Sequence, residues 1–433
     1  MGVMRWVLAV GAAVVGGAVL WAAPPDRGAV APAGRLTVGY TTEPALAAAL
    51  RTTHATVLRR LPALRIVELG TVDAAGAVSA LRRAPGIRFV QRPAERSAAG
   101  EPALVLASLA PRALWEWQYH AIHEDAVPAE VMRAAASVQI AVIDTGADLT
   151  APDIAAKSPQ TYNTRTGNGD VRDVNGHGTF VASLAAGSVT NDEGIAGSGG
   201  DAQLLIVKAT SSGGTFTDVD EAAGITYAVD HGAKIINLSI GGPTTSTTER
   251  RAIQYAVQHG VLVVAAVGNE YAAGNPVEYP AALLQPAGSN GAGGAGLAVA
   301  ASTVGGVRAS FSNTGSWVSL AAPGEGVFGA VSSLASPTSF PRSVLPDAQS
   351  GLYGYGSGTS FATPQVSGAA ALVWAANPAL TAAQVAEILK ETASGAGRWT
   401  PSLGYGVIDV AAAVARAQTG VPPALPVRGV RSR

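Results

Sequence analysis

Residues 137–148 read SVQIAVIDTGAD, an apolar run that stops at Asp144 and continues into a turn sequence. Val, Ile and Ala fill the run without alternating with polar residues, which is typical of a strand covered on both faces of a sheet. An acid at the end of such a strand is either a turn residue, since Asp-Thr-Gly favours a turn, or a functional carboxylate. Taken alone, the stretch favours the turn.

Similar apolar runs recur further along the chain, at 202–209, 233–240, 261–268 and 296–302. Helical stretches separate several of them, at 179–187, 217–232 and 247–260. Strands that alternate with helices predict an α/β fold with a parallel, doubly wound sheet between helices. In such sheets functional groups gather at the carboxyl ends of the strands, which is where Asp144 lies.

Two other polar residues stand where apolar helices are expected to begin. His177 lies between two glycines in DVNGHGTFVASLAAG, whereas His231 and His259 end helical stretches before Gly, as helix caps do. Ser360 lies in YGSGTSFATP, where a lone serine is usually a helix cap. The same place puts its hydroxyl beside the backbone N–H groups of a helix start, which favour negative charge.

Asp144, His177 and Ser360 are together the three residue types of a catalytic triad. A serine hydroxyl is a weak nucleophile that needs a base, and a histidine base needs a carboxylate to fix its tautomer. Each of the three has an ordinary explanation by itself. Their joint occurrence at the loop-bearing edge of one predicted sheet favours catalysis.

With these residues the sequence resembles a known family, the subtilisin-like (subtilase) serine peptidases. The resemblance is carried by AVIDTGAD around Asp144, NGHGTFVAS around His177 and GTSFATPQVSG around Ser360, in that order. It covers roughly residues 115–417 of a domain that we place at 105–417. It implies a serine endopeptidase in which Ser360 is the nucleophile, His177 the general base and then acid, and Asp144 the partner of the imidazole.

The resemblance also implies an oxyanion hole and a substrate cleft. VVAAVGNE places Asn269 in the oxyanion hole, although a turn after a strand would also explain an Asn there. LSIGG (238–242) would pair with an extended substrate, and AAVGN would line the other wall of the primary pocket. The substrate-binding residues implied in this way are Ser239, Gly241, Gly242, Ala266, Gly268 and Glu278.

Glu278, in VEYPA, corresponds to a position that can lie at the base of the primary pocket in the family. A carboxylate there would favour Arg or Lys just before the scissile bond. An exposed loop glutamate is the alternative.

Residues 24–104 are expected to form a separate α+β unit and a linker. Strands are predicted at 35–40, 64–70 and 87–91, helices at 44–61 and 73–84, and a linker at 94–103. A weaker resemblance over 35–96 implies the family's inhibitory propeptide, so that the chain would carry its own intramolecular inhibitor. The net charge is +6 over 26–99 and −8 over 100–433, which would help the two parts dock, unless the arginine enrichment is chance.

The first 23 residues predict export. MGVMR precedes an uncharged apolar run over 6–23 that ends in small residues, the pattern of a secretory signal peptide. Because the run is nearly long enough to cross a bilayer, an N-terminal membrane anchor is the alternative. We therefore expect a secreted or extracytoplasmic protein.

The composition limits the remaining choices. With no Cys, disulfides and thiolate metal sites are excluded, and a net charge of −1 indicates no nucleic-acid partner. We expect a monomer whose chemistry needs no cofactor, with a Pro-rich basic tail at 418–433. The resemblance implies a structural calcium ion at Asp153, near TNDEG (190–194). The rival function is a catalytically silent peptide-binding protein on the same fold.

Overall fold

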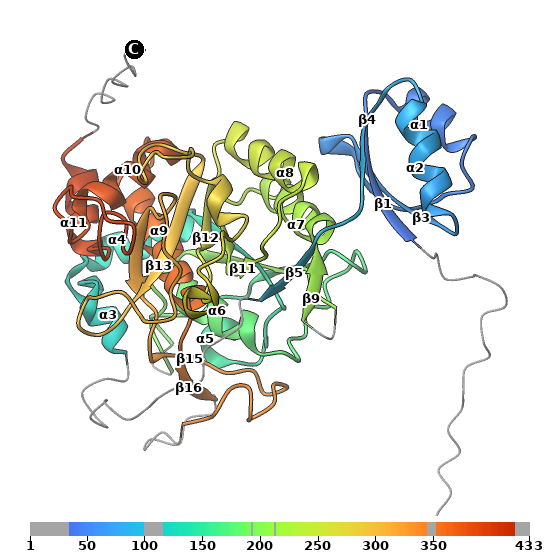
Figure 1. Cartoon of the computed structure of the whole chain (residues 1–433). Coiled ribbons are helices and arrows are strands. Elements are labelled where there is room, and N and C mark those ends of the chain that lie inside the picture. Colours follow the sequence, from blue (N-terminus) through green and yellow to red (C-terminus); the bar gives the residue numbers. More distant parts are fainter. Residues whose placement is uncertain (1–33, 99–115, 192–193, 212–213, 344–351, 421–433) are drawn as a thin grey trace, which may run out of the picture.

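The computed structural model describes residues 34–98, 116–191, 194–211, 214–343 and 352–420, which form a small N-terminal domain and a larger α/β domain (Figure 1). The signal-like segment 1–23 and the tail beyond residue 420 lie outside the described residues. Among the helices in the described ranges, none combines the length and apolar character that a membrane span requires.

The α/β domain is built on a seven-stranded sheet whose neighbouring strands are all parallel. In spatial order the strands are β14 (Leu320–Pro323), β13 (Gly296–Ser302), β12 (Leu262–Ala266), β10 (Ile235–Leu238), β6 (Gln139–Asp144), β8 (Gln203–Lys208) and β7 (Gln160–Asn163). Every residue of β6 is buried. The unalternating apolar runs of the sequence are therefore central strands, as predicted.

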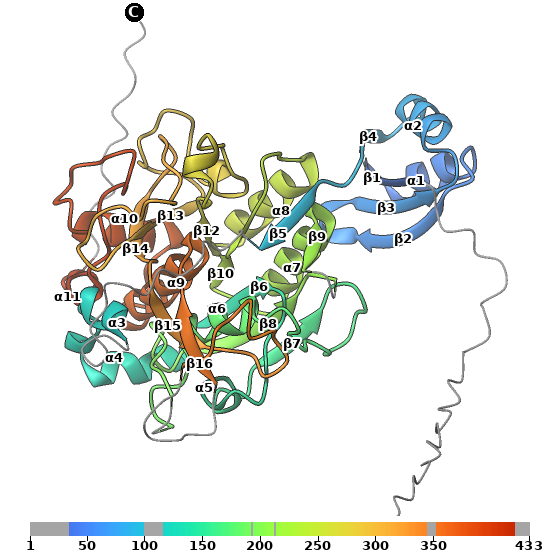
Figure 2. The ribbon, with the colours of Figure 1, turned by 60° about the horizontal axis from the view of Figure 1, so that its bottom comes forward.

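Helices pack on both faces of this sheet (Figures 1 and 2). Ile143 of β6 lies against Gly224 of one helix layer, whereas Ile140 points to the opposite face and lies against Gly199. The first layer holds α7 (Asp218–Asp230) and α8 (Thr247–Gln258), which pack on each other. The second holds α6 (His177–Ala186) and the long helix α9 (Thr359–Ala376), with α10 (Ala382–Thr392) and α11 (Val410–Gln418) beside α9.

Short elements surround this core. They are α3 (Trp117–Ala121), α4 (Ala129–Ala134), α5 (Pro152–Ala155), and the antiparallel pair β15 (Val327–Ala330) and β16 (Tyr353–Gly356). The Gly-rich stretch 285–296 runs as turns from Gln285 into β13.

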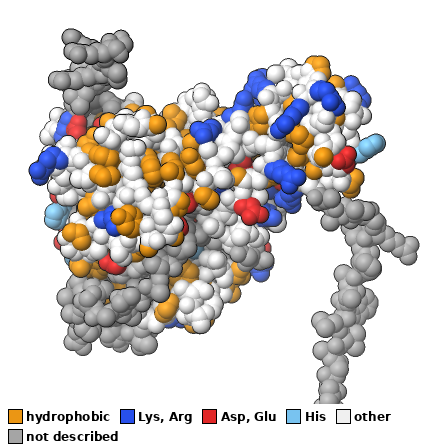
Figure 3. Space-filling model, viewed as in Figure 1, with side chains coloured by type: hydrophobic (Ala, Val, Ile, Leu, Met, Phe, Trp, Pro, Cys, Tyr) orange, Lys and Arg blue, Asp and Glu red, His pale blue; other side chains and the backbone are white. Residues whose placement is uncertain are grey.

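The N-terminal domain is a four-stranded antiparallel sheet with two helices. Its elements are β1 (Gly34–Tyr40), α1 (Glu43–Leu50), β2 (Thr56–Leu61), β3 (Ile66–Thr71), α2 (Ala74–Arg83) and β4 (Ile87–Gln91), in the spatial strand order β2-β3-β1-β4. It has a small apolar core of its own. Arg side chains gather on its surface (Figure 3).

Two sequence predictions for this half of the chain were wrong in part. The helix expected over 44–61 ends at Leu50, and residues 56–61 form β2 instead. Two consecutive β-branched threonines, Thr52 and Thr53, follow the helix and disfavour its continuation. The stretch 94–103 is not only a linker, because residues 95–98 form strand β5 (Glu95–Ala98), which pairs with the α/β domain.

Candidate active site

Asp144 and His177 come together at the carboxyl edge of the sheet. Asp144 is the last residue of β6 and His177 the first of α6, and both side chains are buried. The imidazole Nδ1 lies 2.7 Å from Asp144 Oδ1, which also accepts the Thr145 N–H at 2.6 Å. An Nδ1–H that donates to the carboxylate leaves Nε2 as the basic nitrogen, as a general base requires.

Asp173 orders both of these residues, and the sequence reasoning missed it. Its Oδ1 accepts the Thr145 hydroxyl and the Gly176 N–H, each at 2.8 Å. Its Oδ2 accepts the Thr179 N–H at 2.9 Å, so one buried carboxylate joins the turn after β6 to the start of α6. An Asp four residues before His177, in D-x-N-G, is the available signal, because Asp caps turns and helix starts.

Ser360 lies in the first turn of α9, with His177 beside it. The ring centroids of His177 and Phe361 are 5.6 Å apart, so the imidazole faces this turn. Pro364, inside the helix, has no N–H to donate to the Ser360 carbonyl four residues earlier. The buried Ser239 hydroxyl donates to that carbonyl instead, at 2.7 Å.

Ser239 therefore contacts Ser360 in two ways. Its side chain faces the Ser360 backbone rather than a cleft, and it accepts a bond from Asn237 Nδ2 at 2.9 Å. Its main-chain carbonyl accepts the Ser360 hydroxyl at 3.3 Å. Only the backbone of Ser239 is placed to meet a bound peptide.

Asn269 follows β12 and approaches the same helix start. Its Oδ1 accepts both the Thr359 N–H at 2.8 Å and the Thr359 hydroxyl at 2.9 Å. With the carbonyl end of the amide fixed in this way, the Nδ2 end is a donor held one residue from Ser360. An Asn side-chain amide and the Ser360 N–H are the kind of donor pair that an oxyanion hole requires.

The predicted substrate strand pairs with another part of the chain. β11 (Ile240–Gly241) is antiparallel to β5, with Ile240 opposite Ala98 and Gly241 opposite Ser97. β9 (Thr215–Thr217) pairs with the other edge of β5, which makes a three-stranded sheet in the order β11-β5-β9. The cleft thus accepts an extended peptide backbone between two strands.

A pocket of about 400 Å³ opens beside this sheet. The sequence-predicted residues among those that line it are Gly241, Gly242, Ala266, Gly268 and Glu278. Ser97, Ile240, Pro243, Glu270, Ala273 and Pro276 complete the lining. All of the predicted substrate-binding residues except Ser239 therefore line this one pocket.

Glu278 is buried in this pocket rather than exposed on a loop. Burial, with the Glu270 carboxylate nearby, raises the pKa of Glu278 to about 7. The sequence reasoning did not single out Glu270, whose Oε2 accepts the Asn269 N–H at 2.7 Å. A Cβ at Gly241 would lie 3.0 Å from Glu278 Oε2, so glycine leaves room for this carboxylate.

The surroundings of Asp153 do not fit the calcium ion expected there. Its Oδ1 accepts the Ile195 N–H at 3.2 Å and Asn191 Nδ2 at 3.3 Å, and its Oδ2 accepts the Tyr353 hydroxyl at 2.9 Å. These neighbours are donors, whereas calcium requires oxygen ligands. Within the described ranges no group of three or more His, Asp or Glu could hold a metal, and residues 192–193 lie outside them.

Comparisons with known proteins agree with this geometry. The subtilase family model matches residues 135–406, and the fervidolysin N-terminal prodomain model matches residues 31–92. Thermitase of Thermoactinomyces vulgaris is 35% identical over 265 residues, which are 60% of this chain and 84% of the relative. A thermophilic serine proteinase of Bacillus sp. (strain AK1) is 34% identical over 244 residues, 56% of this chain and 54% of the relative.

The fold has a counterpart among solved structures. The crystal structure of fervidolysin from Fervidobacterium pennivorans, described as a keratinolytic enzyme related to subtilisin, superposes with a TM-score of 0.74 at 26% identity. The match covers 90% of this chain and 61% of that chain. The chain thus spans little more than half the length of the Bacillus proteinase and of fervidolysin. Since the family model covers well over half of its residues, the chain belongs to the subtilase family of subtilisin-like serine proteases, with a fervidolysin-like prodomain at its N-terminus.

Proposed function

We propose that the chain is a secreted serine endopeptidase that hydrolyses peptide bonds through an acyl-enzyme at Ser360. The observation that carries the proposal is the 2.7 Å bond between His177 Nδ1 and Asp144, formed beside the helix turn that holds Ser360. Acyl transfer to a serine requires a buried carboxylate, an oriented imidazole and a hydroxyl beside backbone N–H donors.

The first half-reaction forms the acyl-enzyme. Ser360 Oγ attacks the carbonyl carbon of the scissile bond while His177 Nε2 takes the hydroxyl proton. Asp144 stabilises the imidazolium that results, and the Ser360 N–H and Asn269 Nδ2 bind the oxyanion. When the intermediate collapses, His177 returns the proton to the leaving amine, and the carbonyl carbon stays bonded to Ser360 Oγ.

The second half-reaction repeats these roles with water. His177 removes a proton from a water molecule that attacks the acyl carbon, and the same donors bind the second oxyanion. His177 then protonates Ser360 Oγ as the carboxylic acid leaves. The peptidase is thereby restored with no net change in its own residues.

We infer further that the chain is made as a self-inhibited precursor, with residues 24–104 as propeptide and linker and 105–417 as peptidase. Strand β5 supports this inference, because it pairs with β11 in the place predicted for a substrate. The peptide to be hydrolysed would have to displace β5. Its own propeptide is then the first partner of the peptidase, and protein or peptide substrates follow after maturation.

The signal-like segment 1–23 supports export, with anchoring by the same segment as the alternative. Whether segment 1–23 is cleaved or anchors the chain, we propose that the peptidase acts outside the cytoplasm as a monomer. Glu278 supports a preference for Arg or Lys just before the scissile bond, because a carboxylate at the wall of the pocket attracts a cation.

A fluorophosphonate probe tests the enzyme against the catalytically silent peptide-binding protein. We expect the mature protein to be labelled at Ser360, as read by peptide mass spectrometry, and Ser360→Ala to remain an uncut, unlabelled precursor. A control Ser310→Ala variant changes an exposed serine outside this helix and should still be labelled. Normal processing of the Ser360→Ala chain would contradict self-maturation, and an unlabelled wild type would favour the silent protein.

A further inference from the structure

Arg96 of β5 is a completely buried cation. Its guanidinium contacts two carboxylates, with Nε 3.3 Å from Glu221 Oε2 and Nη2 2.6 Å from Glu249 Oε1. All three side chains have 0% exposure. Arg96 Nη1 also donates to the Glu95 carbonyl at 3.0 Å. A side chain from the segment that occupies the cleft therefore fills an acidic site in the α/β domain.

The α/β domain builds this acidic site from its own parts. Glu249 lies in the first turn of α8, where its N–H donates to Ser246 Oγ at 3.0 Å and its Oε2 accepts the Thr245 hydroxyl at 2.6 Å. Glu221 lies near the start of α7, and its Oε1 is buried without a hydrogen-bond partner among the described residues. Glu249 is therefore held by residues of its own domain, whereas the hydrogen bond to Glu221 Oε2 comes from Arg96.

The site holds three acidic side chains around the single cation Arg96. Asp218, also buried, lies close enough to act on Arg96 and accepts the Ala94 N–H at 2.9 Å. Burial and the neighbouring Glu249 raise the pKa of Glu221 well above its usual range, in spite of Arg96. Buried carboxylates that lose their only cation are costly, so this site favours a replacement cation when β5 leaves.

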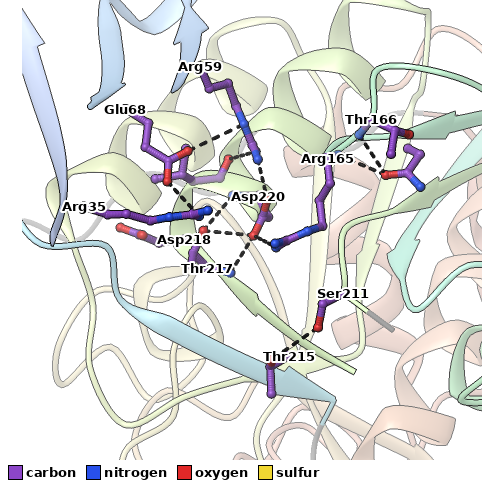
Figure 4. A network of polar contacts seen from close by, with 12 residues as sticks. Arg35, Arg59, Glu68, Arg165, Thr166, Ser211, Thr215, Thr217, Asp218 and Asp220 are labelled. Atoms are coloured by element: carbon purple, nitrogen blue, oxygen red, sulfur yellow. Dashed lines mark hydrogen bonds and ion pairs between the residues drawn. The ribbon is translucent and has the colours of Figure 1, made fainter. Parts of the chain in front are cut away.

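Gly242 gives the guanidinium its room. A Cβ at Gly242 would lie 3.3 Å from Arg96 Nη1 and 3.1 Å from the Glu95 carbonyl. Figure 4 shows the neighbouring contacts at the start of α7, where Asp220 binds Arg59 of the N-terminal domain at 2.7 Å and Arg165 at 2.9 Å. Asp220 thus holds the N-terminal domain, whereas Glu221 faces the cleft segment.

The register of β5 relates this site to the nucleophile. Ala98 lies opposite Ile240 and Arg96 lies opposite Phe216. In a peptide that pairs as β5 does, the next residue lies opposite Ser239, whose carbonyl is 3.3 Å from Ser360 Oγ. If that residue precedes the scissile bond, the residue at the Arg96 place is the fourth before the bond, which we call the fourth position.

We propose that Glu221 and Glu249 form an arginine subsite that selects peptide substrates with Arg at the fourth position. The inference rests on the proposed peptidase function and specifies its substrates. Two carboxylates that address different nitrogens of one guanidinium match the fork of Arg, which the single ammonium of Lys lacks. The same contacts let Arg96 hold the propeptide strand in the cleft until maturation.

The test uses four peptides that differ only at the fourth position, with Arg, Lys, Met or Glu. For the mature wild type we expect kcat/KM to be about 10²-fold higher with Arg than with Met, and intermediate with Lys. The Glu221→Gln/Glu249→Gln double variant should lose most of this preference, while Glu130→Gln, an exposed acid on α4, should keep it. Equal cleavage of the Arg and Met peptides by the wild type would overturn the subsite.

A second measurement needs no turnover, and so separates failure of the subsite from failure of the proposed function. In the full-length Ser360→Ala chain, Arg96→Met should lower the midpoint of urea unfolding, because it leaves two carboxylates unpaired. In the Glu221→Gln/Glu249→Gln background the same change should lower it much less. Equal shifts in both backgrounds would refute recognition of Arg by this pair. An absence of any hydrolysis or labelling, with unequal shifts, would instead refute the peptidase.

Discussion

Two pairs of carboxylates lie near strand β5, and they differ in what faces them. Glu221 and Glu249 enclose Arg96 and are fully buried. Glu278 and Glu270 line a pocket of about 400 Å³ in which no Lys or Arg is among the lining residues. One pair therefore already holds its cation, whereas the other offers space for one.

The difference predicts how strongly each pocket would select a positively charged substrate side chain. Around Arg96 the ion pairs are fully buried, so the loss of either partner leaves a buried charge without compensation. Around Glu278 the pKa is raised to about 7, chiefly by burial, so this carboxylate is partly protonated near neutral pH. We expect the arginine subsite to discriminate strongly and the primary pocket to discriminate weakly and with pH.

The largest effect on the rate of hydrolysis should come from a substitution that lies outside both pockets. Asn269→Ala removes the side chain proposed to bind the oxyanion, and the loss of such a donor typically lowers kcat by about 10²–10³-fold. Because that donor acts on the reacting carbonyl, the loss should be the same whichever side chain fills either pocket. Steady-state kinetics on peptides varied at both positions measure it, and a urea midpoint controls for folding. A loss confined to one peptide would mean that Asn269 acts on substrate side chains.

A smaller effect is expected from Glu278→Gln. The preference for Arg over Ala just before the scissile bond should fall about fivefold, since charge pairs that water can reach contribute up to about 1 kcal/mol. The preference for Arg at the fourth position should not change, because that side chain meets other carboxylates. Competition between paired fluorogenic peptides measures both ratios. An unchanged Arg-to-Ala ratio for the residue just before the scissile bond would contradict the place of Glu278 in the primary pocket.

The smallest effect should appear in the pH dependence. Glu278 has its pKa raised to about 7, so it is neutral well below this pH and ionised above it. The ratio of cleavage rates for peptides with Arg and with Ala just before the scissile bond should therefore rise between pH 6 and pH 8. The rise should be no more than about fivefold. Taking a ratio cancels the titration of the catalytic base, which both peptides share. A Glu278→Gln protein should give a flat ratio, and a ratio that falls with pH would contradict the assignment.

Much of the fold and the pairing of Asp144 with His177 could be predicted because the signals are local. The apolar runs of β6 and β12 mark central strands, and the glycines around His177 and Ser360 mark helix starts that carry polar side chains. Asp144 and His177 are only 33 residues apart in the sequence. A histidine base needs a carboxylate partner, so each residue points to the other.

What could not be predicted depends on pairing over distance. The sequence around β5 is polar and small, and it becomes a strand only because β11 and β9 supply both of its partners. Arg96 lies 125 residues from Glu221 and 153 from Glu249, and no local pattern links them. The role of Ser239 depends likewise on Pro364, whose missing N–H leaves the Ser360 carbonyl in α9 to a serine 121 residues away.

Cleavage-site profiling tests the central claim most directly. A denatured protein mixture is digested with the mature wild type and, in parallel, with mature protein whose Ser360 has been blocked by the fluorophosphonate probe, and the new termini are identified by mass spectrometry. The account predicts many new termini with the active protein, with Arg enriched at the fourth position before each cut, and none with the blocked protein. Cuts that persist after Ser360 is blocked, or an absence of cuts with the active protein, would contradict it.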